Sequence, residues 1–244
     1  MEPILEINDL TKLYSNGRGV EHVTFQINKG DVVGLLGPNG SGKTTTMKAV
    51  VGMCPPDNGS IKIFGHSIED SFEAAMQKVG CLIEMPAFYE HMTAYQNLKL
   101  MARLYPEVTD ERIEHILKVV NLERYKKDKA GRFSLGMKQR LGIALALLSE
   151  PELIILDEPA NGLDIEGIIH VREIINKLAK ERGVSFLISS HIASELEKVC
   201  NKIAVIHEGS MLSFESIEKA LQFNPALEDY FLSKVKEKKG SVII

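Results

Sequence analysis

Short apolar runs recur along the chain at the lengths that β-strands have. They are ILEI (4–7), VTFQI (23–27), VVGLL (32–36), IKIF (61–64), CLI (81–83), LIIL (153–156), SFLIS (185–189) and IAVIH (203–207). VVGLL and LIIL contain no polar side chain, which is typical of central strands that helices cover on both faces. The pattern therefore predicts a sheet whose central strands are fully buried.

Between several of these runs the apolar positions repeat with the period of a helix. The segment TDERIEHILKVV (109–120) begins with a Thr-Asp pair that is typical of a helix N-cap, and its apolar residues share one face: Ile113, Ile116, Leu117 and Val120. A later helix is predicted from Ile168, Val171, Ile175 and Leu178, and Gly183 ends it. Strands that alternate with helices predict an α/β domain with a mainly parallel sheet.

Residues 86–149 interrupt this alternation, because they read almost wholly as helix, from TAYQNLKLMARLY to MKQRLGIALALLS. We predict one domain over residues 1–244. Its α/β core comprises residues 1–85 and 150–215, residues 86–149 form an inserted helical subdomain, and residues 216–244 form a C-terminal tail.

Composition narrows the class of protein only a little. The 244 residues are 44% hydrophobic, which is enough for an ordinary core, and the formal net charge of −4 gives no basic footprint for nucleic acid. The dispersed residues Cys54, Cys81 and Cys200 are interpreted as small buried hydrophobes. No stretch approaches the roughly 20 apolar residues of a membrane span. We expect a cytoplasmic protein without a nucleic-acid partner, whose lysine-rich end (233–244) is a solvated, fraying segment.

The first motif along the chain that indicates a chemical function is GPNGSGKT (Gly37–Thr44), which fits the pattern G-x-x-x-x-G-K-[ST]. It follows the predicted strand VVGLL and opens the predicted helix TTTMKAV, as a phosphate-binding loop requires. The glycines let backbone N–H groups point at phosphate oxygens, and Lys43 would neutralise the β- and γ-phosphates. The Thr44 hydroxyl would be a Mg²⁺ ligand. The loop predicts a bound nucleoside triphosphate.

Acidic residues complete the predicted site at the ends of other strands. Asp157 and Glu158 follow LIIL, at the edge where open α/β sheets place ligands. Asp157 would hold Mg²⁺ through water, and Glu158 would polarise an attacking water. His191 ends another apolar strand, at a position suited to sensing the γ-phosphate. These pieces are compatible with RecA-like motors, small-molecule kinases, GTPases and transporter ATPases. A GTPase would require a guanine-reading N/T-K-x-D segment, and a kinase would not need the acidic pair together with the histidine.

The stretch RFSLGMKQRLGIALALLSEPELIILDEPANGLD (132–164) resembles the ATP-binding cassette (ABC) ATPases. Their signature is a Leu-Ser-Gly-Gly-Gln-like motif at a helix start. Phe133, Ser134, Leu135, Gly136 and Met137 occupy that motif, and Leu135 and Met137 depart from the common Gly and Gln. The resemblance covers nearly the whole chain. It implies an ABC-type P-loop NTPase fold: an α/β, RecA-like parallel-sheet core with an antiparallel β part and an inserted helical subdomain.

The same resemblance implies residue roles. Tyr14 would stack on adenine, Asp164 would belong to the D-loop, and His191 would be the switch histidine. Catalysis is assigned to Glu158, His191 and Lys43. The residues expected to bind ATP are Tyr14, Gly37, Pro38, Asn39, Gly40, Ser41, Gly42, Lys43, Thr44 and Thr45. The residues expected to bind Mg²⁺ are Thr44, Asp157 and Glu84.

The family mechanism implies partners as well. In the family, the signature helix closes over the γ-phosphate bound to the other subunit, so two chains sandwich two ATP molecules head to tail. A helix N-terminus such as that at Ser134 suits this contact with an anion. The chain is therefore expected to form a homodimer that docks on a separately encoded membrane permease, peripheral to the inner face of the membrane.

The segment CLIEMPAFYEHMTAYQNL (81–98) differs from most transporter ATPases, which have Gln at the position of Glu84. Glu-x-Pro followed by an aromatic, together with SLGMKQRLGIA and the tail ALEDYFL, resembles the exporters of bacitracin and lantibiotics. We expect the ATPase subunit of an antimicrobial-peptide exporter. The alternatives are another small exporter, for sodium, a drug or a polysaccharide, and a non-transport ABC protein.

Overall fold

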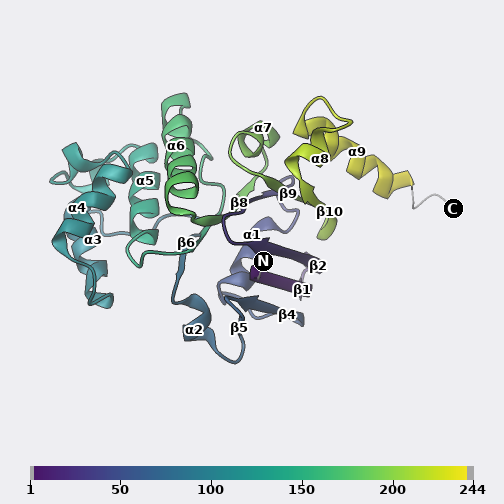
Figure 1. Cartoon of the computed structure of the whole chain (residues 1–244), viewed down its shortest axis with the longest axis horizontal. Coiled ribbons are helices and arrows are strands. Elements are labelled where there is room, and N and C mark those ends of the chain that lie inside the picture. Colours follow the sequence, from purple (N-terminus) through teal and green to yellow (C-terminus); the bar gives the residue numbers. More distant parts are fainter. Residues whose placement is uncertain (1–2, 241–244) are drawn as a thin grey trace.

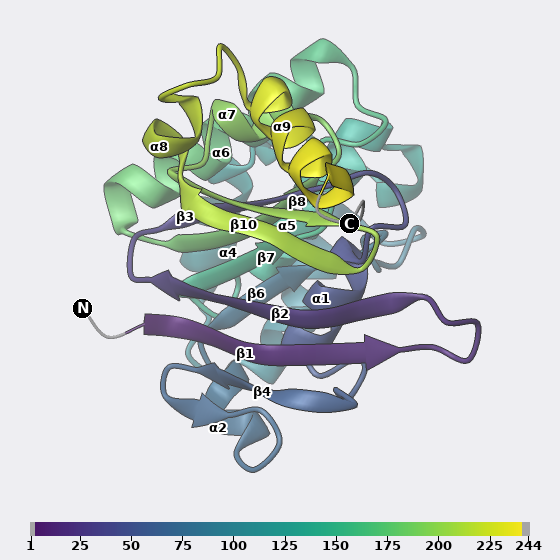
Figure 2. The ribbon, with the colours of Figure 1, turned by 90° about the vertical axis from the view of Figure 1, so that its right-hand side faces the viewer.

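A computed structural model describes residues 3–240, and its strands form one curled, mixed sheet (Figures 1 and 2). The strands are β1 (Pro3–Leu13), β2 (Gly19–Asn28), β3 (Val32–Leu36), β4 (Asn58–Ile63), β5 (His66–Ser67), β6 (Val79–Leu82), β7 (Leu153–Leu156), β8 (Ser185–Ser190), β9 (Lys202–His207) and β10 (Ser210–Ser216). Their order across the sheet is β5-β4-β1-β2-β10-β9-β3-β8-β7-β6.

The sheet has a parallel part and an antiparallel part. Strands β9, β3, β8, β7 and β6 are parallel, and every residue of β3 and β7 is buried, which confirms the prediction of central strands covered on both faces. Strands β1, β2, β4 and β5 pair antiparallel. The two parts join through one parallel pair between β10 and β2, Ser210 with Glu21. The predicted α/β core with an antiparallel part is confirmed.

The helices group by position along the chain. They are α1 (Lys43–Val50), α2 (Phe72–Met76), α3 (Ala94–Met101), α4 (Asp110–Val119), α5 (Leu135–Ala146), α6 (Ile165–Arg182), α7 (Ala193–Glu197), α8 (Ile217–Leu221) and α9 (Leu227–Gly240), with short 3₁₀ turns at Ala102–Leu104, Glu123–Tyr125 and Ala130–Arg132. Between β6 and β7 a loop at residues 83–93 leads into α3, α4 and α5, which form a group at one end of the molecule in Figure 1.

The two helices predicted from apolar periodicity are present with the expected ends. Thr109 caps α4 by accepting a hydrogen bond from the Arg112 N–H. Helix α6 begins at Asp164, whose side chain accepts from the Gly167 N–H, and ends at Gly183 in the left-handed region at φ 63°. These caps satisfy backbone groups that a helix end leaves unpaired.

Two apolar cores lie on opposite faces of the parallel sheet. Val33 and Leu35 of β3 face a core shared with α1 and the antiparallel strands. Val32 and Leu36 face a core shared with helices α3 to α7 and with α9. This alternation follows from the period of two in a strand. It fixes β3, and therefore the loop that follows it, between two packed layers.

Three expectations from the sequence require correction. Strands β5 and β10 were not predicted, because β5 has two residues and β10 (SMLSFES) has no continuous apolar run. Cys81 is exposed, since its side chain leaves β6 on the face opposite to its buried neighbours. Residues 233–240 continue α9 instead of fraying, and the Tyr230 hydroxyl of that helix hydrogen-bonds to Glu215 of β10.

Residues 241–244 of the predicted tail lie outside the described residues. Within residues 3–240, none of the helices has both the length and the apolar character that a membrane crossing requires.

Candidate nucleotide-binding site

The phosphate loop joins β3 to α1 along a path that only glycine allows at two points. Gly42 has φ 109°, and a Cβ there would lie 2.2 Å from Cγ1 of Val20. A Cβ on Gly37 would lie 2.2 Å from the carbonyl oxygen of Ile206. The loop therefore sits tightly between β2 and β9.

Lys43 is the cation at the centre of this loop, and its side chain is only 5% exposed. Its Nζ donates to the carbonyl oxygens of Gly37 (2.8 Å) and Pro38 (3.2 Å) and pairs with Glu158 Oε1 at 3.1 Å. A buried ammonium needs such partners to remain charged. The loop thus holds a positive charge ready for an anionic ligand.

A cavity of about 280 Å³ opens above the loop. Its walls are formed by Tyr14, Asn16, Arg18, Gly19, Asn39, Gly40, Gly42, Lys43, Thr44, Thr45 and Glu158. Tyr14, predicted to stack on adenine, lies at this cavity although residues 15–36 separate it from the loop in sequence. Sequence reasoning missed Asn16 and Arg18, which belong to the same hydrogen-bonded turn as Tyr14 between β1 and β2.

The structure brings together Asp157 and Thr44, two of the residues expected to bind Mg²⁺. The Thr44 hydroxyl donates to Asp157 Oδ2 at 2.8 Å, and the Asp157 carboxylate is nearly buried, with 4% of the residue exposed. Ser189, a residue that sequence reasoning missed, donates to the other oxygen, Oδ1, at 2.6 Å. The parallel register of β7 and β8 pairs Leu156 with Ile188 and so brings the two following residues together.

Glu158 lies between the two other residues predicted to be catalytic. Its Oε2 is 2.8 Å from Nδ1 of His191, and its Oε1 pairs with Lys43. Its backbone is left-handed, with φ 48°, and its N–H donates to the Ser189 hydroxyl at 2.8 Å. A glutamate in this region is strained, so the contacts on both sides determine where its carboxylate points. The carboxylate faces the cavity.

Glu84, the third predicted Mg²⁺ ligand, is not in contact with Thr44 or Asp157. Its carboxylate pairs with Lys48 of α1 at 2.5 Å, and its side chain is 60% exposed. Its backbone is also left-handed, with φ 62°. Leu82 of β6 pairs with Leu156 of β7, and Glu84 therefore leaves the same edge of the sheet as Glu158.

The signature residues lie away from the phosphate loop. Ser134 caps α5, and its hydroxyl accepts from the Met137 N–H at 3.3 Å. A Cβ on Gly136 would approach Cα of Gly167 at 3.7 Å, so the start of α5 packs beside the start of α6 and its cap, Asp164. Among the described residues, the wall of the nucleotide cavity includes none of residues 134–137.

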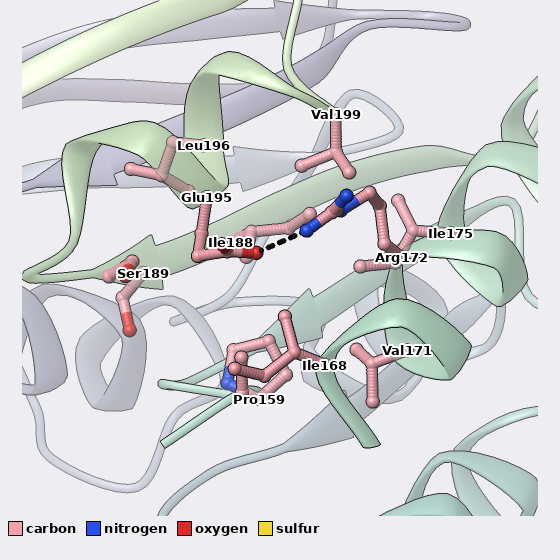
Figure 3. Close-up of a pocket in the computed structure, with 12 residues that line it drawn as sticks. Pro159, Ile168, Val171, Arg172, Ile175, Ile188, Ser189, Glu195, Leu196 and Val199 are labelled. Carbon is pink, nitrogen blue, oxygen red and sulfur yellow. Dashed lines mark hydrogen bonds and ion pairs between the residues drawn. The ribbon is translucent and has the colours of Figure 1, made fainter. Parts of the chain in front are cut away.

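A small cavity of about 30 Å³ lies behind Ser189, between α6, α7 and β8 (Figure 3). Arg172 of α6 crosses it and donates to Oε2 of Glu195 in α7 at 3.0 Å. Apolar side chains such as Ile168 and Val199 form the rest of the wall. This ion pair connects the helix that Asp164 caps with the helix that follows His191.

One segment, Asn28-Lys29-Gly30-Asp31, has the spacing of a guanine-reading motif, which sequence reasoning overlooked. It forms the turn before β3, where Asp31 pairs with Lys202 and accepts from the Asn28 N–H. The phosphate loop follows the other end of β3. The segment therefore lies at the sheet edge opposite to the nucleotide cavity and cannot read a base bound there.

Two of these features suit a phosphate-bound Mg²⁺. The Thr44 hydroxyl and the Asp157 carboxylate form a hard oxygen pair at the cavity, and the buried hydroxyl of Ser41 has no hydrogen-bond partner within the described chain. The glycine loop, the lysine and the acid at the end of the neighbouring strand define a P-loop nucleoside triphosphatase.

Comparison with known proteins identifies the family. The profile described as ABC transporter matches residues 20–161. The chain is 43% identical to the bacitracin transport ATP-binding protein BcrA of Bacillus licheniformis over 90% of its own length and 72% of the relative. It is 39% identical to the lantibiotic transport ATP-binding protein SrtF of Streptococcus pyogenes over 95% of its own length and 97% of the relative.

A solved structure described as the ATP-binding subunit of an ABC transporter superimposes with a TM-score of 0.84 and 32% identity, covering 95% of this chain and 99% of the other. The chain therefore belongs to the ABC transporter family, and it is an ATP-binding and ATP-hydrolysing subunit of that family.

Proposed function

We propose that this chain powers the export of an antimicrobial peptide, of bacitracin or lantibiotic type, through a separately encoded permease. The observation that carries the proposal is the joint similarity to relatives named for bacitracin and lantibiotic transport. The intact cluster of Lys43, Glu158 and His191 supplies the ATPase that such export requires.

In the proposed reaction, Glu158 is the general base. Its carboxylate reaches the cavity and accepts the proton of the attacking water, while His191 holds the carboxylate from the other side. Lys43 neutralises the negative charge that develops on the phosphoryl oxygens. When phosphate binds, it replaces Glu158 as the partner of Lys43, and the Glu158 carboxylate is released.

The proposed metal site is formed by Thr44, Asp157 and Glu84. Thr44 and Asp157 already face one another, and Ser189 fixes the orientation of the Asp157 carboxylate. A bound Mg²⁺ would neutralise phosphate charge. Glu84 would join this site after it leaves Lys48.

We propose that the active unit is a homodimer with two composite sites. The signature start of α5 lies apart from the loop within one chain, so a second chain is needed to bring Ser134 and the Gly136 N–H to the phosphates. The dimer would sit at the inner face of the membrane against its permease.

The function is tested by expressing this chain with its permease in a sensitive bacterium and measuring resistance to bacitracin and to a lantibiotic. Higher resistance than with the permease alone, lost in the Lys43→Ala variant, supports the proposal. Sodium tolerance or small-drug resistance without any change in peptide resistance would assign the chain to another small exporter instead.

A further inference from the structure

Lys48 of α1 is the neighbour that distinguishes the surroundings of Glu84. Among the described residues, the ion-pair partner of Glu84 is the Lys48 ammonium, 2.5 Å from Oε1. The contact with the Glu84 carboxylate raises the pKa of Lys48 above its usual value. The side chain of Lys48 is 26% exposed and that of Glu84 is 60% exposed.

Lys48 also lies close to the proposed metal ligands along α1. It follows Thr44 by four residues, and positions four apart are neighbours on the same face of a helix. Four residues correspond to a rise of about 6 Å. Lys48, which pairs with the Glu84 carboxylate, therefore lies about one helical turn along α1 from Thr44, whose hydroxyl contacts Asp157.

The strand order places Glu84 on the side of the site where this short move is possible. Asp157 donates its N–H to the carbonyl oxygen of Leu82, the last residue of β6. Glu84 follows two residues later on a left-handed backbone, which turns its side chain toward α1. Two cations can therefore attract one carboxylate: the Lys48 ammonium and a metal at Thr44.

We propose that Lys48 is a positioning residue. While the site lacks metal, Lys48 holds the Glu84 carboxylate away from the phosphates, and when Mg²⁺ binds, the carboxylate leaves Lys48 for the metal. This inference rests on the proposed metal site. Without Lys48, the Glu84 carboxylate would face incoming phosphate unpaired, and like charges repel. With Lys48, the negative charge of Glu84 is neutralised until a divalent cation competes for it.

The inference predicts a specific change in metal dependence. The measured quantity is the ratio of the Kd of a fluorescent, non-hydrolysable ATP analogue in EDTA to its Kd in excess Mg²⁺. Lys48→Met should increase this ratio by about two- to fivefold, because Mg²⁺ no longer has to compete with the Lys48 ammonium for the Glu84 carboxylate, and such an exposed ion pair is weak. Lys48→Arg, which keeps the charge, should leave the ratio near that of the wild type.

The Glu84→Gln background separates this effect from simple repulsion between Lys48 and the metal. In the Glu84→Gln background, Lys48→Met should change the ratio of the two Kd values by less than half as much as it does in the wild-type background. Lys99→Met on α3, which removes a comparable exposed pair with Asp110 outside the site, is the control for general effects. Thermal unfolding of each variant shows that it is folded.

The outcomes distinguish two failures. A wild-type ratio near one would overturn the proposed metal site itself. A wild-type ratio well above one that Lys48→Met leaves unchanged, or raises equally in the Glu84→Gln background, would overturn the role of Lys48 alone.

Discussion

The hydroxyl of Ser189 lies 2.6 Å from Oδ1 of Asp157 and donates a hydrogen bond to it. The same hydroxyl accepts the backbone N–H of Glu158 at 2.8 Å. One fully buried serine on β8 therefore orients both acids of the site, the proposed metal-binding carboxylate of Asp157 and the proposed base Glu158. Neither contact involves the nucleotide, so Ser189 acts through its neighbours.

Ser189→Ala is expected to lower both stability and turnover. The substitution removes both hydrogen bonds and leaves a buried carboxylate oxygen short of a donor, which typically costs about 1–3 kcal/mol. The free energy of unfolding, from urea titration, and the steady-state ATPase rate measure the two effects.

Ser185→Ala is the matched control, since Ser185 is equally buried at the other end of β8 and accepts only from the Gly30 N–H. It should lose comparable stability and keep its kcat. If both variants hydrolyse ATP equally well, the Ser189 hydroxyl has no part in arranging the acids.

Local patterns predict the parts of this site that lie in one stretch of chain. The phosphate loop depends on glycines and Lys43 within eight residues, so the sequence alone locates it. Contacts between separate strands follow a different rule. Ser189 meets Asp157 because β7 and β8 pair Leu156 with Ile188, and no periodicity in either strand reveals that register.

The same reasoning explains the other omissions. Lys48 of α1 pairs with Glu84, which follows β6, although 36 positions separate them in sequence, and neither segment signals its partner. Asn16 and Arg18 line the cavity because the β1–β2 turn lies over the phosphate loop. Strand β10 (SMLSFES) was missed because it has neither a continuous apolar run nor a regular alternation of polar and apolar residues.

Ser134→Arg is expected to leave ATP binding by the monomer intact and to abolish dimerisation and turnover. The change places a bulky cation at a helix start that, in the proposed dimer, receives an anion between two chains. Analytical ultracentrifugation with ATP and an ATPase assay measure these effects.

Thr109→Arg provides the control for loss of the helix cap. Thr109 caps α4 through the same kind of bond, 3.3 Å from the Arg112 N–H, at a helix start outside the proposed dimer contact. It should cost similar stability, about 1 kcal/mol, while the dimer and turnover persist. Normal ATPase activity in the Ser134→Arg variant would mean that one chain forms a complete site.

Glu195→Ala should destabilise the chain by about 1–3 kcal/mol, because Arg172 would lose its charged acceptor beside an apolar cavity. Lys198→Ala removes only an exposed neighbour of Glu195 and should change stability by less than about 1 kcal/mol. The double variant Arg172→Met with Glu195→Leu should recover most of the loss, since apolar replacements of a buried pair are often tolerated. Chemical denaturation without nucleotide measures all three, and equal effects of the two alanine variants would contradict the role of the Arg172 contact.

Glu158→Gln is expected to retain ATP binding and to slow hydrolysis by about 10²-fold or more, the usual contribution of a general base. The amide keeps the shape of the side chain and a contact with His191, but it cannot accept the proton of water. ATP-bound dimers should therefore accumulate, which size-exclusion chromatography in Mg²⁺ and ATP would detect.

The control for this substitution is Glu208→Gln. Glu208 has the same left-handed backbone, with φ 49°, and also pairs with a histidine, His207, but it is exposed and does not line the cavity within the described chain. It should hydrolyse ATP at the wild-type rate and form no trapped dimer. Unchanged steady-state turnover in the Glu158→Gln variant would exclude Glu158 as the base and leave Lys43 and His191 to explain hydrolysis without it.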